Sequence, residues 1–360
     1  MLVCCGGLAL VLSACASSSP GHAAPPPAGT SKGTTATTGG SKGGSKSKST
    51  SPSKPPSTST TSTTVPGLAA PAALTPFPTA PAIPGEGSWA AAGRPVQGRP
   101  AVYETTLVPP GGTQPAGIAW MDTRLLSARL YSGSLSPGGG PYTYTAPIQP
   151  AQATSLVAAF NGGFQMKTAG GGYYTTGTLV DPLVQGAASL VISTNGSVTV
   201  GAWGSTVSMT PAVASVRQNL TLLVSGGKPT ALASSADWQA WGFTCGATSC
   251  TPGVPGIEHQ WRSGVGVTAD GALVYVNGPS LAPVQLADLL VRAGVVRGME
   301  LDINPDWPVF ATYDPATPNG LATPSNGKGL LSGTIQGPAT FFDPSWNRDF
   351  ITMSARAASS

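Results

Sequence analysis

The most strongly patterned stretch of the chain is RSGVGVTADGALVYV, residues 262–276. Its two apolar runs, 264–268 and 272–276, are rich in valine and flank Asp270-Gly271. Valine favours the pleated, half-buried surface of a strand, and Asp-Gly is a preferred pair for a tight hairpin turn. The stretch therefore predicts an antiparallel β-hairpin.

A helix and a further strand are expected directly after this hairpin. Between residues 283 and 293, the apolar side chains recur with helical spacing and Gly294 supplies a C-terminal stop. Residues 295–302, VVRGMELD, then have the composition of a strand. The sequence thus predicts a hairpin–helix–strand unit.

Other turn signals indicate that strands dominate the rest of the domain. Asn195-Gly196 separates two apolar runs, and Gly226-Gly227 follows another. A short helix is expected from about Gln152 to Val157. The predicted class is α+β, with a β-rich mixed sheet, hairpins and the hairpin–helix–strand unit. Further strands are expected at 100–108, 116–121, 125–131, 188–193, 197–200 and 219–224.

The composition excludes several architectures. The chain contains 48 glycines and 36 prolines, together 84 of 360 residues, and only 9% of its residues are charged. So many helix breakers exclude a coiled coil or a helical bundle. The glycines follow no three-residue period, which excludes collagen. We expect one large domain over residues 85–360.

The net positive charge of the chain comes from the segment before that domain. Five lysines, but no Asp or Glu, precede Glu86, whereas the remaining chain carries 13 basic and 14 acidic residues. A balanced domain argues against nucleic acid as a partner. The basic segment is either attracted to an anionic envelope surface or is a solvated spacer. The lysines are Lys32, Lys42, Lys46, Lys48 and Lys54.

The first 15 residues are interpreted as a targeting signal. A short apolar core ends in Leu12-Ser-Ala-Cys15, which resembles the lipobox of bacterial lipoproteins. The resemblance implies cleavage before Cys15, lipid attachment to its thiol and anchoring at the extracytoplasmic face of the membrane. No Lys or Arg precedes the core, which leaves open an ordinary secretory signal or a different start. Residues 16–84, rich in Ser, Thr, Pro, Gly and Lys, are expected to form a disordered tether.

Two cysteines lie within the expected domain, at Cys245 and Cys250. In an oxidising compartment they can close a small disulfide loop. A metal site is the alternative, although the only histidine in this part of the chain is His259.

The candidate catalytic residues lie in Glu300-Leu-Asp302-Ile-Asn304. On a strand, alternate side chains share a face, so Glu300, Asp302 and Asn304 are expected to point the same way, about 6–7 Å apart at successive Cα atoms. Two carboxylates this close favour one protonated and one ionised group, the arrangement that glycoside hydrolysis uses. The same oxygens could hold a divalent cation, or could lie on a solvent-facing strand edge.

Two further features are candidates for binding phosphate. Glycines in Asn161-Gly162-Gly163-Phe164 could present N–H groups to an anion, with Lys167 adding a positive charge, or could simply form a turn. Arg262 suits bidentate recognition of a phosphate, or is a structural partner of Glu300 or Asp302. Tryptophans, Trp307 among them, could stack on sugar rings, although core packing is the alternative.

The order of these motifs resembles the phosphodiester glycosidase domain over about residues 155–350. The resemblance rests on Phe160–Phe164, Arg262–Gly271, Gln285–Leu290 and Met299–Asp302, and residues 103–133 look like the start of actinobacterial members. It implies an envelope-anchored enzyme that hydrolyses a sugar-1-phosphodiester, of the GlcNAc-1-phosphate type, on the sugar side. Glu300 stands where the family commonly has Asn, and Ile303-Asn304 replace two glycines.

The resemblance assigns roles residue by residue. Asp302 would be the nucleophile or base, and Glu300 would orient the substrate or act as the second carboxylate. Arg262 and Lys167 would bind the phosphate, with the N–H groups of the glycine motif. No cofactor is required by the sequence.

Two rival functions stay open at this point. One is a non-catalytic glycan-binding or wall-binding lipoprotein on the same fold, which the altered Ile303-Asn304 favours. The other is a metal-dependent phosphodiesterase. Within residues 85–360, serine-hydrolase and P-loop or dinucleotide-binding motifs do not occur in the sequence.

Overall fold

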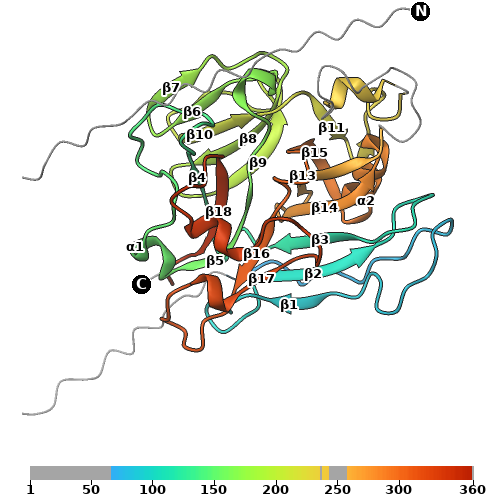
Figure 1. Ribbon diagram of the computed structural model, residues 1–360, viewed down its shortest axis with the longest axis horizontal. Helices are drawn as coiled ribbons and strands as arrows, with labels where there is room; N and C mark the ends of the chain where they lie inside the picture. The colour runs from blue at the N-terminus through green and yellow to red at the C-terminus, as the bar shows by residue number, and fades with distance from the viewer. Residues whose placement is uncertain (1–65, 236, 243–257, 359–360) are drawn as a thin grey trace, which may run out of the picture. The chain divides into compact units, whose positions relative to one another are not determined.

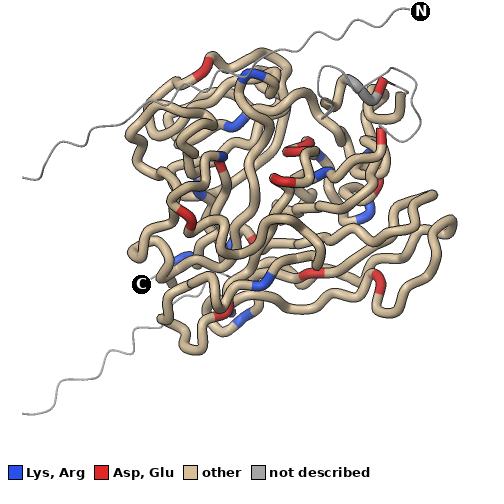
Figure 2. Tube along the Cα trace, viewed as in Figure 1, with Lys and Arg blue, Asp and Glu red and all other residues tan. Residues whose placement is uncertain are grey.

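The computed structural model describes residues 66–235, 237–242 and 258–358 (Figure 1). The predicted signal peptide, the lipidation site Cys15 and the Cys245–Cys250 disulfide lie outside these residues. Within the described part, no helix is long and apolar enough to cross a membrane. Figure 2 shows Lys and Arg interspersed with Asp and Glu along the trace, in agreement with the balanced charge of this part of the sequence.

An eight-stranded sheet forms the largest described element of the fold. Every neighbouring pair in it is antiparallel. Its order is β1-β2-β3-β14-β13-β15-β11-β12, so β13 lies between the two strands that flank the helix. The strands are β1 (Ala90–Ala92), β2 (Val102–Leu107), β3 (Ala116–Met121), β14 (Leu273–Leu281), β13 (Gln260–Thr268), β15 (Val295–Glu300), β11 (Leu222–Ser225) and β12 (Lys228–Pro229).

The predicted hairpin–helix–strand unit is present as β13, β14, α2 and β15 (Figure 1). The helix α2 (Pro283–Arg292) buries Leu286, Leu289 and Leu290 against one face of the sheet. Gly294 follows the helix with φ of +88°, a left-handed conformation that glycine adopts without strain. Local sequence signals therefore specify this unit correctly.

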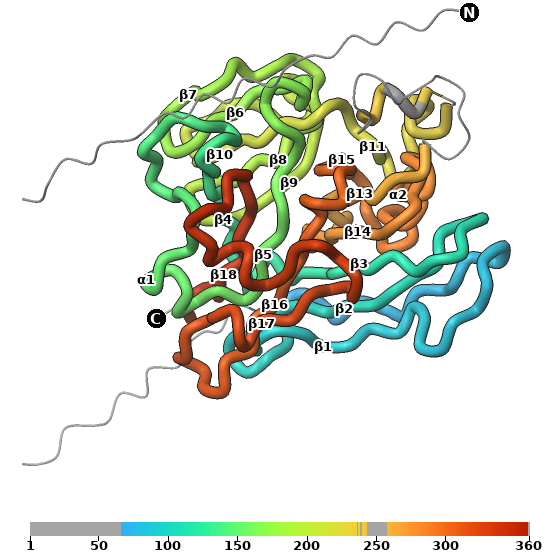
Figure 3. The backbone as a smooth tube through the Cα atoms, in the orientation of Figure 1, coloured from blue at the N-terminus to red at the C-terminus, as the bar shows by residue number. Residues whose placement is uncertain are grey.

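Two five-stranded sheets cover the opposite face of the large sheet. The tube in Figure 3 shows β5 between β16 and β18. One sheet has the order β7-β6-β10-β8-β9, with strands Thr178–Asp181, Tyr173–Thr175, Val213–Gln218, Ala188–Ser193 and Val198–Ala202. The other has the order β17-β16-β5-β18-β4, with strands Gly327–Gly329, Phe310–Tyr313, Leu156–Asn161, Phe350–Ala355 and Leu126–Tyr131.

The two faces of the large sheet lie in different hydrophobic clusters because strand side chains alternate. On β14, Leu273 and Tyr275 pack into the core shared by the three sheets, whereas Val274 and Val276 pack under α2. Because successive residues of β14 are apolar, both faces of the sheet are apolar there, and each face is covered by other elements. The α+β, β-rich class predicted from the sequence is confirmed.

Of two local predictions, the Asn195-Gly196 turn is confirmed and the helix near residues 152–157 is wrong. The Asn195-Gly196 turn joins β8 and β9, with Gly196 at φ of +76°. The helix expected near 152–157 is instead the short α1 (Pro150–Ala153), because residues from Leu156 onward form the buried central strand β5. Four 3-10 segments complete the description: Met166–Thr168, Trp238–Trp241, Pro324–Asn326 and Pro338–Phe342.

The boundary placed at residue 84 requires correction. Residues 66–84 were assigned to the tether, but Leu68 and Phe77 are buried in the α2 cluster. The backbone N–H of Leu68 donates to Asp122 Oδ2 at 2.7 Å, and the Arg292 guanidinium lies 4.1 Å from the Phe77 ring centroid. A few large apolar side chains are enough to dock this Pro-rich segment onto the domain.

We predict that Leu286→Ala lowers the free energy of unfolding by about 2–5 kcal/mol, because it leaves a cavity between α2 and the sheet. Chemical denaturation would measure the change. Leu179→Ala is the matched control, since Leu179 is 57% exposed, and should change stability by less than about 0.5 kcal/mol. Equal effects of the two substitutions would contradict this account of the packing.

Candidate functional site

Asp302 follows the end of β15 and is fixed to Ser263 of the adjacent strand β13. The N–H of Ser263 donates to the Asp302 carbonyl at 2.8 Å, and the N–H of Asp302 donates to Ser263 Oγ at 3.1 Å. The N–H of Leu301 donates to the Ser263 carbonyl at 2.8 Å. These bonds prolong the strand pairing past Glu300 and hold the Asp302 backbone rigidly.

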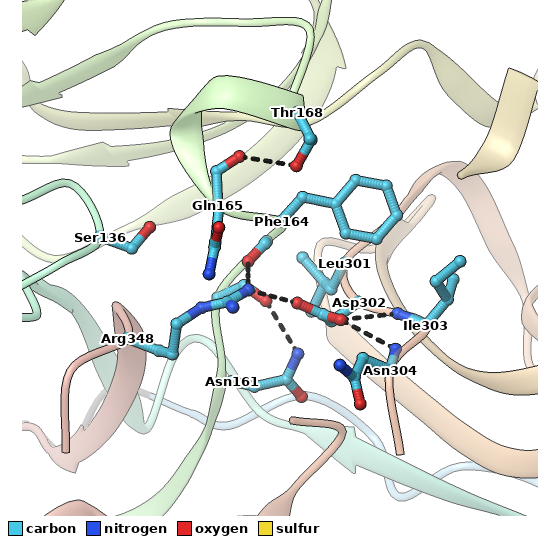
Figure 4. A network of polar contacts seen from close by, with 12 residues as sticks. Ser136, Asn161, Phe164, Gln165, Thr168, Leu301, Asp302, Ile303, Asn304 and Arg348 are labelled. Carbon is cyan, nitrogen blue, oxygen red and sulfur yellow. Dashed lines mark hydrogen bonds and ion pairs between the residues drawn. The ribbon is translucent and has the colours of Figure 1, made fainter. Parts of the chain in front are cut away.

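The Asp302 side chain accepts several charge-assisted hydrogen bonds (Figure 4). Its Oδ1 accepts the N–H groups of Ile303 at 2.8 Å and Asn304 at 3.0 Å, and its Oδ2 lies 2.6 Å from Arg348 Nη2. Asp302 is only 2% exposed. Its carboxylate is therefore oriented on both oxygens before any substrate binds.

Burial raises the pKa of Asp302 to about 6, against the opposing effects of Arg348 and of the two backbone N–H groups. A carboxyl group with a pKa this close to neutrality is ionised at pH 7 and is a better proton acceptor than an ordinary aspartate. This combination of orientation and raised pKa suits a base or nucleophile.

Arg348 lies just before β18, is buried like Asp302, and contacts several groups around it. Its Nη2 also donates to the Gly163 carbonyl at 3.1 Å, and its guanidinium carbon lies 4.6 Å from the centroid of the Trp307 ring. Trp307 is half-buried and meets Trp346 edge-on at 5.3 Å. Arg348 Nε is buried without a hydrogen-bond partner in the described part of the chain.

Glu300 is in a different environment, wholly inside the domain. Its Oε1 lies 2.6 Å from Arg262 Nη1, and both side chains are fully buried. Arg262 also donates to the carbonyls of Leu281 at 2.7 Å, Trp241 at 3.2 Å and Glu258 at 3.1 Å. Its guanidinium thus joins three separate backbone segments to Glu300.

The phosphate-binding role expected for Arg262 does not fit this geometry. A guanidinium that is buried and already bonded to a carboxylate and three carbonyls has no face left for a substrate. The structure instead matches the alternative role, that of a partner for Glu300. Burial raises the pKa of Glu300 to about 7, while the neighbouring Arg262 lowers it and Asp302 raises it further.

Glu300, Asp302 and Asn304 were expected to share one face of a strand, but only part of this segment is a strand. β15 ends at Glu300, so the strict alternation does not extend to Asn304. Ile303 packs against Phe164 rather than beside Met299 in the central core.

The three polar residues do not converge on one point. The side-chain oxygen of Asn304 accepts the N–H of Asp306 at 3.0 Å, and Glu300 and Asp302 are each paired with a different arginine. Within the described residues, no group of three or more His, Cys, Asp or Glu side chains could hold a metal. The cation site at Glu300, Asp302 and Asn304 remains an untested prediction.

Asn161 proves to be a structural link between strands. Its Oδ1 accepts the Tyr275 hydroxyl at 2.7 Å and the N–H of Val309 at 3.1 Å. Its Nδ2 donates to Ser263 Oγ at 3.0 Å and to the Gly162 carbonyl at 2.8 Å. The amide is therefore fully engaged within the protein and has no free group for a phosphate.

The glycines after Asn161 are required by close packing. A Cβ on Gly162 would lie 2.1 Å from Asp349 Oδ2, and one on Gly163 would lie 2.8 Å from Asn219 Oδ1. The N–H groups of Gly162 and Phe164 already donate to Asp349 O and Asn219 Oδ1. These two N–H groups are thus committed to the fold and do not form the expected anion cradle.

Lys167 is exposed in the 3-10 segment that follows, and it forms no ion pair with any residue that the structure describes. Its contribution to substrate binding stays a prediction.

Three important residues are not among the candidates predicted from the sequence: Arg348 and the buried pair Arg217–Asp349 beside it. Arg217 Nε lies 2.7 Å from Asp349 Oδ2, and both side chains are fully buried. The signal was present: Arg348 and Asp349 are adjacent charges directly before the apolar run 350–353 in a chain with few charges. The rule that singled out Glu300 and Asp302 would have found them.

Two cavities among the described residues lie away from this site. One of about 550 Å³ lies between β4, β6, β8 and β10, and another of about 340 Å³ is lined by His259 and Gln285 among others. Asp302 lines neither. The chemistry of the residues, rather than the size of a hollow, therefore identifies the candidate site.

The chain is similar to one known family over part of its length. Residues 154–302 match the phosphodiester glycosidase family. The predicted resemblance to this family is confirmed. The matched segment begins just before β5 and ends at Asp302, so it contains the glycine motif, Arg262 and Glu300.

Solved structures of low sequence identity also match. The chain is 16% identical to the catalytic domain of zebrafish N-acetylglucosamine-1-phosphodiester alpha-N-acetylglucosaminidase, auto-inhibited by its pro-peptide, covering 75% of this chain and 88% of that one, with a TM-score of 0.42. A hypothetical protein from Synechocystis is 12% identical, covering 72% of this chain and 63% of that one, with a TM-score of 0.39. A search of curated proteins gave no match.

We predict that Arg262→Met lowers the free energy of unfolding by about 3–5 kcal/mol, because it leaves Glu300 buried beside no opposite charge. Adding Glu300→Gln to Arg262→Met should recover part of that loss, since the buried carboxylate is then gone. Denaturant unfolding of the two single variants and the double variant would measure the coupling. Strictly additive losses would show that the pair does not act as a unit.

Proposed function

We propose that the chain hydrolyses a sugar-1-phosphodiester on the sugar side of the phosphate. The single observation that carries the proposal is the Asp302 carboxylate, buried, oriented and at the end of the segment that matches the phosphodiester glycosidase family. An ionised aspartate offers about four lone-pair sites, of which three are occupied here. The free site on Oδ2 is the one that would attack the anomeric carbon or accept a proton from water.

The leaving group explains why one carboxylate suffices. A phosphomonoester departs as a stable anion and needs little protonation, so a second carboxylate is not required as a general acid. Glu300 is fully buried against Arg262 and therefore acts at most by positioning β15 and Asp302.

Arg348 replaces Arg262 as the residue that we expect to bind the phosphate. The structure gives hydrogen bonds from its Nη2 alone, and its Nε has no partner within the described residues. A guanidinium with unused donors beside the reacting carboxylate can pair with a phosphate oxygen and can stabilise the departing charge.

The natural substrate is proposed to be a glycan of the cell envelope, with a linkage of the GlcNAc-1-phosphate type. Support comes from the lipobox-like Leu12-Ser-Ala-Cys15 and from the Ser/Thr/Lys-rich segment after it, which together would anchor the domain outside the membrane.

A second candidate function is glycan binding without turnover. It is favoured by Ile303, which is 2% exposed and packs against Phe164 directly beside Asp302. The branched side chain of Ile303 leaves less room for a substrate beside Asp302 than a glycine at this position would leave. The experiment below separates the two functions.

We predict that the purified chain releases free sugar from UDP-GlcNAc or from one of a panel of GlcNAc-1-phosphodiesters, as followed by mass spectrometry. Asp302→Asn should reduce kcat/KM at least about 100-fold, because the amide can neither attack nor accept a proton. Asp306→Asn is the control, since it makes the same change at an exposed carboxylate nearby and should leave turnover intact. Undiminished release by folded Asp302→Asn would refute the assignment, and a folded chain that only binds would favour the second function.

The pH dependence of turnover supplies an independent test. Because the pKa of Asp302 is raised to about 6, kcat/KM should fall as the pH drops through about 6 and the carboxylate becomes protonated. The rate should be nearly constant just above that range. A rate that rises on acidification would instead require a protonated group in the reaction.

A further inference from the structure

A cavity of about 550 Å³ lies between two of the three sheets and has no assigned role. Residues of β4, β6, β8 and β10 line it, together with Thr143 and Tyr144. The volume falls within the range of small-molecule sites, about 300–1,000 Å³. Because Asp302 does not line it, this cavity is distinct from the proposed hydrolytic site.

The cavity is built by a specific turn rather than by loose packing. The hairpin between β8 and β9 touches β4, where the N–H of Ala128 donates to the Gly196 carbonyl at 2.8 Å. Gly196 has φ of +76°, and a Cβ there would lie 2.5 Å from Ser127 Cβ. Arg356 Nη1 donates to the Asn195 carbonyl at 2.6 Å and fixes the turn from outside. One end of the cavity is thus rigid.

Hydroxyl groups line much of the cavity wall. Thr143 and Thr176 are joined across it by a hydrogen bond of 3.2 Å. The hydroxyls of Ser193 and Thr194 form no side-chain hydrogen bond with any residue that the structure describes, so their donors and acceptors are available to a ligand. The lining hydroxyl residues are Ser127, Thr143, Thr176, Ser193, Thr194 and Ser215.

Arg129 is the charged residue among those that line this cavity. Its neighbours Ala128 and Leu130 also line the cavity and are buried in the core, whereas Arg129 is half-buried. Its guanidinium carbon lies 5.0 Å from the centroid of the Tyr144 ring. Within the described residues, the guanidinium has no hydrogen bond or ion pair, and no Asp or Glu lines the cavity to neutralise it.

These features together select a class of ligand. An unneutralised guanidinium held over an aromatic ring presents a planar fork of donors that matches a carboxylate or a phosphate. Tyr144 and Tyr174 supply amphipathic rings, and the free hydroxyls supply hydrogen bonds of the kind that sugar hydroxyls make. A single arginine, without a basic cluster, does not suit a nucleic acid.

We propose that this cavity binds an anionic saccharide, with Arg129 pairing with its carboxylate or phosphate and with Ser193 and Thr194 binding its hydroxyls. The site would hold a charged glycan on the domain independently of hydrolysis at Asp302. It therefore goes beyond the proposed function and does not depend on it.

The test uses the full chain and three oligosaccharide probes in isothermal titration calorimetry. They are an unsulfated chondroitin tetrasaccharide, which carries carboxylates, a phosphorylated pentamannose, and neutral chitotetraose. We expect at least one of the two anionic probes to bind more tightly than the neutral one, and the stronger of the two identifies the anionic group. High salt should weaken that binding.

Two matched variants assign the binding to the cavity. Arg129→Gln should lower the affinity for the anionic probe at least roughly tenfold, because a charge-assisted hydrogen bond is lost. Arg124→Gln removes the same charge from an exposed residue outside the cavity and should leave the affinity unchanged. Thermal unfolding would confirm that both variants are folded.

Three results would overturn the proposal: no binding by the folded chain, equal affinity for neutral and anionic probes, or an unchanged affinity of Arg129→Gln. The Asp302→Asn variant separates this proposal from the hydrolytic one. If Asp302→Asn abolishes turnover but still binds the anionic probe, both the hydrolytic proposal and the cavity proposal are supported. If the chain turns over no substrate but Arg129→Gln still lowers the affinity, only the cavity proposal is supported.

Discussion

The position of the candidate carboxylate depends on one buried amide. Asn161 at the end of β5 accepts the Tyr275 hydroxyl and donates to Ser263 Oγ, which joins the sheet containing β5 to the large sheet. Ser263 Oγ in turn accepts the N–H of Asp302. A residue that the sequence suggested as a ligand for phosphate therefore determines where the reacting group lies. Because each of these groups is buried and bonded, losing any one would leave another buried polar atom unpaired, at a cost of about 1–3 kcal/mol.

Three arginine–carboxylate pairs lie in the described interior and differ in their exposure. Arg217 pairs with Asp349 and Arg262 with Glu300, and all four of these side chains are fully buried. Only the third pair, between Arg348 and Asp302, retains a small exposed fraction and a guanidinium with unused donors. A buried ion pair is costly to form and more costly to break, so such pairs are poor candidates for chemistry unless a substrate can reach one of them. This constraint favours Asp302 over Glu300 as the reacting carboxylate.

How far the sequence predicts this arrangement depends on the distance between partners along the chain. The hairpin, α2 and β15 were predicted because Asp270-Gly271, the leucine spacing and Gly294 are local signals. The assignment of Arg262 failed because its partner, Glu300, is 38 residues away, and nothing local distinguishes a free guanidinium from a paired one. Arg348 was missed although it lies beside an apolar run, and its contact with Asp302, 46 residues away along the chain, is formed only in the fold. The tether prediction for residues 66–84 was wrong because it rested on their Pro-rich composition, whereas two apolar side chains, Leu68 and Phe77, are enough to bury this segment against the domain.

The cavity and the buried charges are connected through β10. Ser215 lines the cavity, and Arg217, two residues further on, bonds Asp349, the neighbour of Arg348. Residues two apart on a strand share a face and lie about 6–7 Å apart at their Cα atoms. β10 is paired on both sides, with β6 and β8, so it cannot shift without breaking two ladders. The strand therefore holds the cavity wall and the charge network in a fixed relation. Arg129, which forms no ion pair with any described residue, lies on β4 where this strand contacts β10, an arrangement that suits a binding wall.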